Sequence, residues 1–315
     1  MILRALKNII IILTLSCTLL SCVFEDLPIC NTQNVTLQFT YKLNPTDSDL
    51  FRISASVIDV YIFDQNGVYI QTESGNVTPD PTGKYTLSID LPEGKYTFLG
   101  IGYKDSFFEV GQVKRDLKDY FQTGLTPGST KLSDFRIKSK YEEGYFFPYN
   151  IESFLKGSIQ FAQIKSGQEN LYEMPMIQNK NRINIRLKGL PDTEYQPVLQ
   201  ANNGRYDFEN QIPADAQNKI YTPKWNSDKN FYFFDVLRLV EAQPIQMILI
   251  DKQGNPVKEF KATNLIEEIM RSPEFNTQKD LDKELVYNID LEFGNTGVIS
   301  ITINGWENVP VKPES

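Results

Sequence analysis

The fold is decided by the stretch Val35-Thr36-Leu37-Gln38-Phe39-Thr40-Tyr41-Lys42-Leu43. Large apolar side chains occupy every odd position and polar side chains every even one. Successive side chains of a β-strand point to opposite faces, so this period of two predicts a strand with one buried and one solvent-facing side. The first sheet of the protein is therefore expected to begin at residues 35–43.

Two turn motifs, one in each half of the chain, predict β-hairpins. Asp64-Gln65-Asn66-Gly67 lies between two apolar runs, and Asp251-Lys252-Gln253-Gly254 lies between two others. In the first motif Asn-Gly supplies the positive φ that a tight turn needs. Each hairpin follows a cleanly alternating strand, at 35–43 in the first half and at 183–190 in the second. The halves therefore resemble each other, although the unequal spacing makes this a weak sign of duplication.

Short strand signals recur along both halves, separated by polar turns. Residues 105–131 are predicted to be loop-like, with at most one short helix near 116–121. The best helix candidate is 264–271, because Asn264 can cap it and Pro273 ends it. This pattern predicts an all-β protein with one β-sandwich in each half. The further strands are expected at 57–63, 68–72, 84–90, 95–103, 132–139, 144–149, 158–165, 195–200, 205–208, 230–239, 245–251, 257–260, 284–293 and 298–304.

The N-terminal segment has the organisation of a bacterial lipoprotein signal. Arg4 and Lys7 precede an apolar run at 9–20, which is too short for a comfortable transmembrane span of roughly 20 residues. Leu19-Leu20-Ser21-Cys22 then resembles a lipobox, in which the signal is cut before a cysteine that becomes acylated. Cys17 is the rival cleavage site, but it would shorten the apolar core. Lipidation is therefore expected at Cys22.

The length of 315 residues favours two domains after removal of the signal. We expect a signal peptide at 1–21, a lipid-anchored tether at 22–32, an N-terminal sandwich at 33–176 and a C-terminal sandwich at 177–315. The net charge of −8 becomes about −10 once the two basic residues of the signal are lost. An acidic body without a basic cluster is not expected to bind nucleic acid.

The chain contains no histidine. This removes the commonest general base and the usual zinc ligands, so we expect neither an enzyme nor a metal or cofactor site. Of the three cysteines, Cys17 leaves with the signal and Cys22 would be acylated, so Cys30 has no partner for an intramolecular disulfide. Cys30 is either a buried apolar residue near the first strand, which we favour, or a functional thiol that forms an intermolecular link or is reactive.

Other motifs have plainer interpretations. Asp64 and Asp251 could ligate calcium, but turn chemistry explains them better because neither belongs to an acidic ladder. Aromatic residues fill both faces of the segments 145–149 and 231–234. One face of each should be core, and the other could stack on sugar rings or receive a partner's strand. The alternative, that both faces are covered by sandwich and loops, is favoured.

Together these features resemble the FimB-type fimbrial anchor lipoproteins of the Bacteroidales, minor subunits of type V fimbriae. The resemblance spans nearly the whole mature chain and departs from the family at 145–149, where a histidine-containing segment is expected. It is carried by Cys22, Phe24-Glu25-Asp26-Leu27, Cys30, Val60-Tyr61-Ile62-Phe63-Asp64-Gln65-Asn66-Gly67, Leu91-Pro92-Glu93-Gly94-Lys95-Tyr96-Thr97-Phe98, Asn181-Arg182-Ile183-Asn184-Ile185, Gly189-Leu190 and Asn304-Gly305-Trp306.

The resemblance implies two transthyretin-like β-sandwiches, outer-membrane attachment through the lipid, exposure at the cell surface and a place at the base of a fimbrium. Subunits of this type polymerise when one subunit's strand completes a groove in its neighbour. A lipid at Cys22 would keep the first strand in place, so this subunit could donate a strand or cap the fibre. Stalk subunits are the implied partners, and the alternating residues Ile299, Ile301 and Ile303 are the candidate donor strand.

A permanent core strand is an equal interpretation of these isoleucines. A surface glycan-binding lipoprotein of a polysaccharide-uptake system is the alternative function. Such a protein usually presents solvent-facing tryptophans, and this chain has only Trp225 and Trp306. A flat, exposed aromatic strip would favour glycan binding, whereas an open sheet edge or a loosely held terminal strand would favour the anchor.

Overall fold

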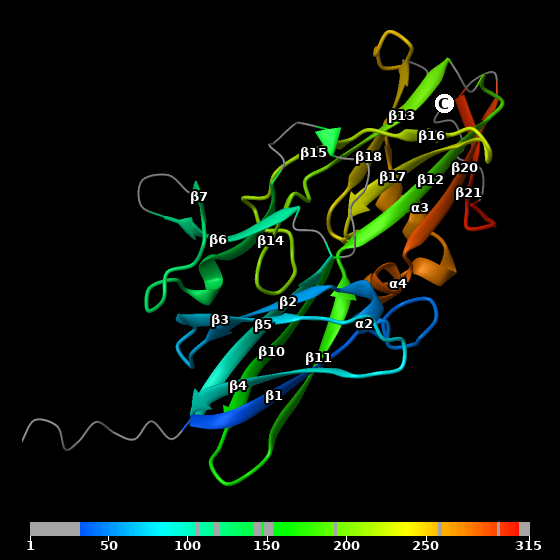
Figure 1. The fold of residues 1–315 in the computed structure, drawn as a ribbon. Helices are drawn as coiled ribbons and strands as arrows, with labels where there is room; N and C mark the ends of the chain where they lie inside the picture. The colour runs from blue at the N-terminus through cyan, green and yellow to red at the C-terminus, as the bar shows by residue number, and fades with distance from the viewer. Residues whose placement is uncertain are drawn as a thin grey trace, which may run out of the picture.

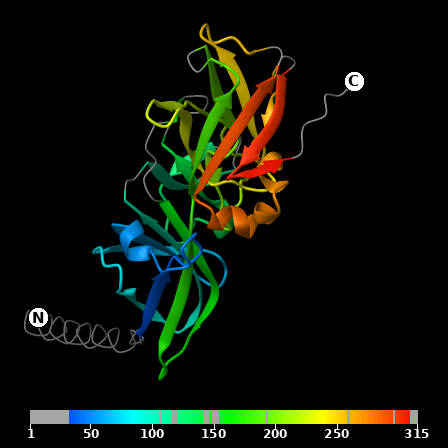
Figure 2. The same cartoon turned by 90° about the vertical axis from the view of Figure 1, so that its right-hand side faces the viewer.

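The computed structural model describes residues 32–104, 107–115, 120–140, 146–147, 154–191, 194–257, 260–294 and 297–308. Strands dominate the described chain (Figure 1), which confirms the all-β expectation. None of the described helices is long and apolar enough to cross a membrane. The strands form a lower part that contains β1 and an upper part that contains the C-terminal strands (Figures 1 and 2).

The lower part is built around β1 (Thr32–Thr40), which lies between β11 and β4. β1 runs parallel to β11 and antiparallel to β4. β10 and β11 pair only near Gly157 and then separate, so the seven-stranded sheet folds into two layers around a buried apolar core. The order is β3-β2-β5-β10-β11-β1-β4, with β2 Val57–Phe63, β3 Tyr69–Asn76, β4 Tyr85–Pro92, β5 Gly94–Tyr103, β10 Phe154–Ile164 and β11 Asn170–Gln178.

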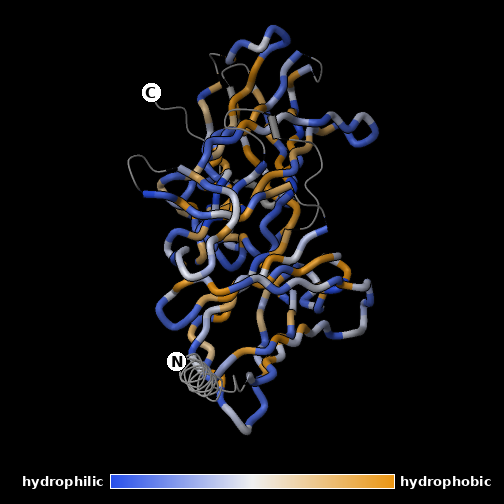
Figure 3. The backbone as a smooth tube through the Cα atoms, turned by 60° about the vertical axis from the view of Figure 1, so that its left-hand side comes forward, coloured by the Kyte–Doolittle hydropathy of each residue, from blue (hydrophilic) through white to orange (hydrophobic). Residues whose placement is uncertain are grey.

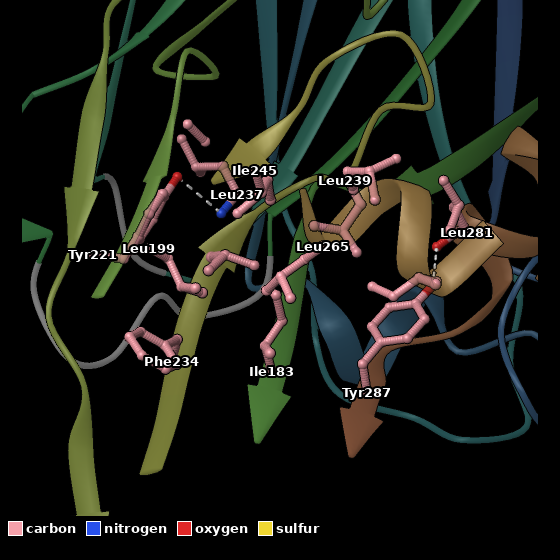
Figure 4. Packing of buried hydrophobic residues seen from close by; sticks show 14 of the residues in the cluster. Ile183, Leu199, Tyr221, Phe234, Leu237, Leu239, Ile245, Leu265, Leu281 and Tyr287 are labelled. Atoms are coloured by element: carbon pink, nitrogen blue, oxygen red, sulfur yellow. Dashed lines mark hydrogen bonds between the residues drawn. The ribbon is translucent and has the colours of Figure 1, made fainter. Parts of the chain in front are cut away.

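The upper part packs a six-stranded sheet against a five-stranded one. Residues such as Ile183, Leu199 and Phe234 form the apolar core of this part (Figure 4). The sheet orders are β16-β17-β12-β20-β21-β22 and β19-β18-β13-β15-β9. The bounds are β9 Phe146–Phe147, β12 Lys180–Lys188, β13 Tyr195–Ala201, β15 Lys219–Tyr221, β16 Lys224–Asn226, β17 Phe231–Leu237, β18 Ile245–Asp251, β19 Thr263–Asn264, β20 Val286–Gly294, β21 Gly297–Ile303 and β22 Trp306–Asn308.

A smaller sheet joins the two parts. It has the order β14-β8-β6-β7, with β6 Phe108–Lys114, β7 Tyr120–Thr123, β8 Phe135–Ser139 and β14 Arg205–Tyr206. The loop-like expectation for 105–131 was therefore wrong, because β6 and β7 lie within that range. Phe135 of β8 and Leu99 of β5 belong to the same core cluster as Ile183, so the larger core extends across both parts. Figure 3 shows apolar segments inside and polar segments at the turns.

The predicted helix at 264–271 is confirmed as α3 (Leu265–Met270). The side chain of Asn264 accepts a hydrogen bond from the backbone N–H of Ile266, as an N-cap should. The sequence prediction missed two further helices, α2 (Phe51–Ser54) and α4 (Gln278–Lys283), and two 3-10 turns at Leu132–Asp134 and Pro273–Phe275. Within the helix expected near 116–121, residues 116–119 lie outside the described chain and Tyr120 belongs to β7.

Both hairpin turns are confirmed, with Gly67 at φ 69° and Gly254 at φ 83°. One carboxylate oxygen of Asp64 accepts from two backbone N–H groups, at 2.9 and 2.8 Å. Asp251 does the same at 2.9 and 2.8 Å, so the turn accounts for both acids. The strand expected after the second turn is reduced to one bridge between Ile250 and Pro256 in the described residues.

Candidate functional site

The N-terminal strand fills a groove between two neighbours. The side chains of Val35, Leu37 and Phe39 are completely buried, and Tyr41 just beyond β1 is 2 % exposed. Each fully buried apolar side chain of this size contributes about 1.5–3 kcal/mol, so the four together stabilise the strand by roughly 6–12 kcal/mol. This is comparable with the whole stability of a domain, about 5–15 kcal/mol.

The C-terminal end of β1 is fixed by the loop that follows it. Asp49 accepts a hydrogen bond from the backbone N–H of Tyr41 at 2.9 Å, and the buried Asn44 donates to the Tyr41 carbonyl at 2.9 Å. Phe39 stacks on Phe51 with 5.3 Å between ring centroids. Neighbouring side chains and both flanking ladders must therefore rearrange before β1 can leave.

The candidate donor strand lies inside a sheet. β21 pairs antiparallel with β20 on one side and with the short β22 on the other. Ile301 is 2 % exposed and Ile303 is completely buried, whereas the side chain of Ile299 lies outside the described set. Releasing this strand would expose the two buried isoleucines at a cost of about 3–6 kcal/mol. The donor role stays a prediction.

A buried polar cluster connects the lower and upper parts. Lys156 on β10 is 2 % exposed, and its ammonium donates to the Phe208 carbonyl at 2.7 Å. The pKa of Lys156 is lowered to about 7, mainly by burial and in part by Arg238, while Asp207 and Glu209 act in the opposite direction. Lys156 therefore ties the loop around Phe208 to the lower part through a single buried amine.

The same loop is held from two other directions. Asn179, between β11 and β12, exchanges two hydrogen bonds with Asn210, at 2.7 and 2.8 Å. Arg238 donates to the Asn210 carbonyl at 2.7 Å and forms a bidentate ion pair with Asp282 of α4, at 2.6 and 2.8 Å. We call residues 156, 179, 210, 238 and 282 the junction cluster. Satisfied buried networks of this kind favour one arrangement of the two parts.

Sequence reasoning missed the junction cluster, although one signal was present. Asp207 accepts from the backbone N–H groups of Glu209 and Gln211 at 2.9 and 2.8 Å. This is the same aspartate turn that the sequence showed at Asp64 and Asp251. It builds the loop whose carbonyls receive Lys156 and Arg238.

The outward face of the six-stranded sheet has a polar hollow of about 330 Å³. It is lined by Arg186, Asn288, Asp290, Thr302, Asn304 and Gly305. Arg186 donates to Asp290 at 3.0 Å and Asn288 donates to Asn304 at 3.3 Å, so these side chains already bind one another. Among the described residues no group of three or more metal-ligating side chains occurs.

The aromatic segments are partly resolved by the structure. In 231–234, Tyr232 and Phe234 are buried, and Arg182 covers the ring of Phe233 at 5.0 Å. Trp225 is 40 % exposed but packs on Tyr232 with 4.7 Å between centroids. Trp225 therefore does not form the flat, exposed aromatic strip that would favour glycan binding. The side chains of Trp306 and of 145–149, and all of Cys17, Cys22 and Cys30, lie outside the described set.

Comparison with known proteins gives one family. Residues 26–312 match the sequence model of the fimbrillin-A associated anchor proteins Mfa1 and Mfa2. No curated protein matches the chain.

Three solved structures share the fold. A candidate polysaccharide-binding protein from Bacteroides thetaiotaomicron is 20% identical with a TM-score of 0.76, and the match covers 90% of this chain and 99% of that one. The fimbrial anchor protein Mfa2 from Porphyromonas gingivalis is 17% identical with a TM-score of 0.72, over 89% and 100%. A candidate adhesin from Bacteroides ovatus is 21% identical with a TM-score of 0.71, over 93% and 98%.

Proposed function

Because the chain belongs to the family of fimbrillin-A associated anchor proteins, we propose that it anchors and terminates a strand-exchange-assembled fimbrium at the cell surface. In this proposal the mature chain is a non-enzymatic lipoprotein, attached to the outer membrane through Cys22. Its partners are fimbrial stalk subunits. The observation that carries the proposal is that the first strand fills its own groove, with Val35, Leu37 and Phe39 completely buried.

The position of β1 supports an anchoring role. A subunit that extends a fibre by strand addition must offer an empty groove to its neighbour. In this chain β1 is hydrogen-bonded on both sides, and its first residue, Thr32, comes ten residues after Cys22 in the sequence. A lipid at that cysteine would hold the strand and its groove together, so that the fibre could not continue past this subunit.

The other end of the chain would make the joint. We assign the donor role to β21, with Ile299, Ile301 and Ile303 as the inserted side chains. Its position next to the three-residue edge strand β22 supports this choice, because only a short ladder closes that side. The cost of withdrawing the isoleucines would be offset when the same side chains enter the apolar groove of a stalk subunit.

We further propose that the chain consists of two tandem transthyretin-like sandwiches behind the signal at 1–21 and the tether at 22–32. The change of sheet between β11 and β12 supports a division close to residue 176. β11 ends at Gln178 as a member of the first sheet, and β12 begins at Lys180 as a member of the six-stranded sheet.

The test is to delete the gene, restore it with Cys22→Ala, and image the cells. The anchor proposal expects long fimbriae that are shed into the medium in both strains. Cys30→Ala is the matched control and should restore short, attached fimbriae, and Cys17→Ala should do the same if Cys22 carries the lipid. Unchanged fimbriae in the deletion strain would refute the proposal and favour a glycan-binding lipoprotein.

A further inference from the structure

One large apolar side chain is turned out of the lower part at a conformational cost. Phe161 on β10 is 66 % exposed and has a φ of 58°. A bulky residue rarely adopts a positive φ, because its Cβ then lies too close to the following carbonyl oxygen. This conformation costs roughly 1–2 kcal/mol. The chain therefore keeps a strained backbone at the position where it presents an aromatic ring to its surroundings.

A β-bulge produces this arrangement. Ile159 pairs with Phe98 and Ala162 pairs with Tyr96, so Gln160 and Phe161 together face a single residue of β5. Leu155 and Ile159 both pack toward the apolar core, and an unbroken alternation would place Phe161 there as well. The bulge shifts the alternation by one residue, which buries Ala162 and turns Phe161 outward.

Phe161 lies at the end of the molecule where the first strand begins. Asn170, at the start of β11, pairs with Val35 in a parallel ladder, so the β10–β11 hairpin before Asn170 is level with the first residues of β1. Phe161 is three residues before Ile164, about 10 Å along the strand from that hairpin. Figures 1 and 2 show the hairpin and the start of β1 at the same end.

We propose that Phe161 contacts the lipid bilayer beside the anchor, with its ring in the headgroup–acyl boundary. This inference rests on the proposed lipid attachment at Cys22. The chain from Cys22 to Thr32 spans at most about 35 Å when fully extended, so this end of the molecule stays within that distance of the membrane and a shorter tether path allows contact. Phenylalanine, like tryptophan and leucine, occurs on the apolar faces that membrane-surface segments bury at this boundary. A second, short contact would limit rotation of the subunit about its flexible lipid.

The chemistry around Phe161 suits an interface. Lys95 on β5 pairs with Gln163 on β10, and Glu93 accepts a hydrogen bond from the backbone N–H of Ser166 in the hairpin. Polar residues therefore lie close to Phe161 along β5, β10 and the hairpin, and Leu171 near the start of β11 is a second exposed apolar side chain, at 50 %. A few apolar side chains among polar groups suit an interfacial contact better than a broad apolar protein interface.

The test uses the lipidated mature chain in vesicles of phosphatidylethanolamine and phosphatidylglycerol, with and without bromine-labelled acyl chains. Phe161→Trp adds a fluorophore at the proposed contact. Tyr120→Trp adds one at another exposed aromatic site, on β7 and away from the β10–β11 hairpin, as the matched control (Tyr120 is 52 % exposed). Relative to the parent chain, the fluorescence added at 161 should fall about twofold in labelled vesicles, and that added at 120 should not change.

Flotation of the same samples separates the two proposals. A chain that floats with vesicles but shows no quenching at 161, or equal quenching at 161 and 120, overturns the Phe161 contact and leaves the anchor standing. A chain that does not float overturns both. Phe161→Gly removes the ring, and glycine adopts the positive φ without strain. This variant should still float, but the fluorescence anisotropy of a label on the upper part should fall, because the subunit rotates more freely.

Discussion

Lys156 of the junction cluster should make the stability of the protein depend on pH, and the variant Lys156→Met tests this. Methionine is similar in length and removes the amine that donates to the Phe208 carbonyl. The native amine has a pKa of about 7, against an ordinary value of 10.5, mainly because burial disfavours its charged form. The charged groups that act on it are Asp207, Glu209 and Arg238. Unfolding exposes the amine to water and restores its ordinary affinity for a proton.

The sign follows from proton binding in the two states. Between pH 7 and 10.5 the unfolded chain holds a proton on Lys156 that the native chain lacks, so stability rises with pH in this window. Below pH 7 both states are protonated and the dependence vanishes. The slope approaches 1.4 kcal/mol per pH unit, so the native chain should gain about 3 kcal/mol over Lys156→Met between pH 7 and 9.5.

Urea unfolding at half-unit intervals from pH 6 to 9.5 measures this difference. Taking the difference between the two chains cancels the pH dependence of every titrating group that both contain. These groups include tyrosines such as Tyr41, because burial raises the pKa of Tyr41. Lys84→Met, at a lysine exposed to solvent, is the matched control and should leave the pH dependence unchanged. Parallel curves for the native chain and Lys156→Met would show that the amine is hydrated in the native state and would refute the buried junction.

Three further predictions concern stability, each measured by urea unfolding at pH 8. Phe39→Ala should cost about 3–5 kcal/mol through the cavity it leaves in β1's groove, and Thr36→Ala on the outward face should cost less than about 1 kcal/mol; equal losses would contradict the assigned faces. Arg238→Met or Asp282→Leu alone should cost about 3–5 kcal/mol, and the double variant should recover most of that loss, because a lone buried charge is worse than none; additive losses would argue against a coupled pair. Phe161→Gly should unfold at the same or higher urea concentration than the native chain, since glycine relieves the positive φ; a large loss would mean that the ring stabilises the fold.

Local chemistry made much of the fold predictable. The alternation at 35–43, the aspartate–glycine turns and the Asn264 cap each depend on neighbours in sequence, and each appears in the structure as expected. β1 nevertheless ends at Thr40, because Tyr41 already belongs to the loop held by Asn44 and Asp49.

The missed elements depend on contacts distant in sequence. β11 contains Pro175, which argues against a central strand because proline lacks an N–H donor. The structure accommodates it where β10 leaves β11, since the last pair between those strands joins Gly157 to Met176. Likewise the residues next to Phe161 in the sequence do not predict a bulge, because the bulge is defined only by the pairing with the partner strand β5.

The same distinction explains which parts of the candidate site could be anticipated. The lipidation motif and the first strand each depend on residues that are consecutive in the sequence, so the sequence alone predicts that the N-terminal end is anchored. The junction cluster joins Lys156, Asn210 and Asp282, which only folding brings together. A pull on the upper part of an anchored chain must pass through this cluster and the shared core before it reaches β1. β1 itself resists because its two ladders, to β4 and β11, must break together. Anchoring in this proposal therefore requires both a retained strand and a rigid junction above it.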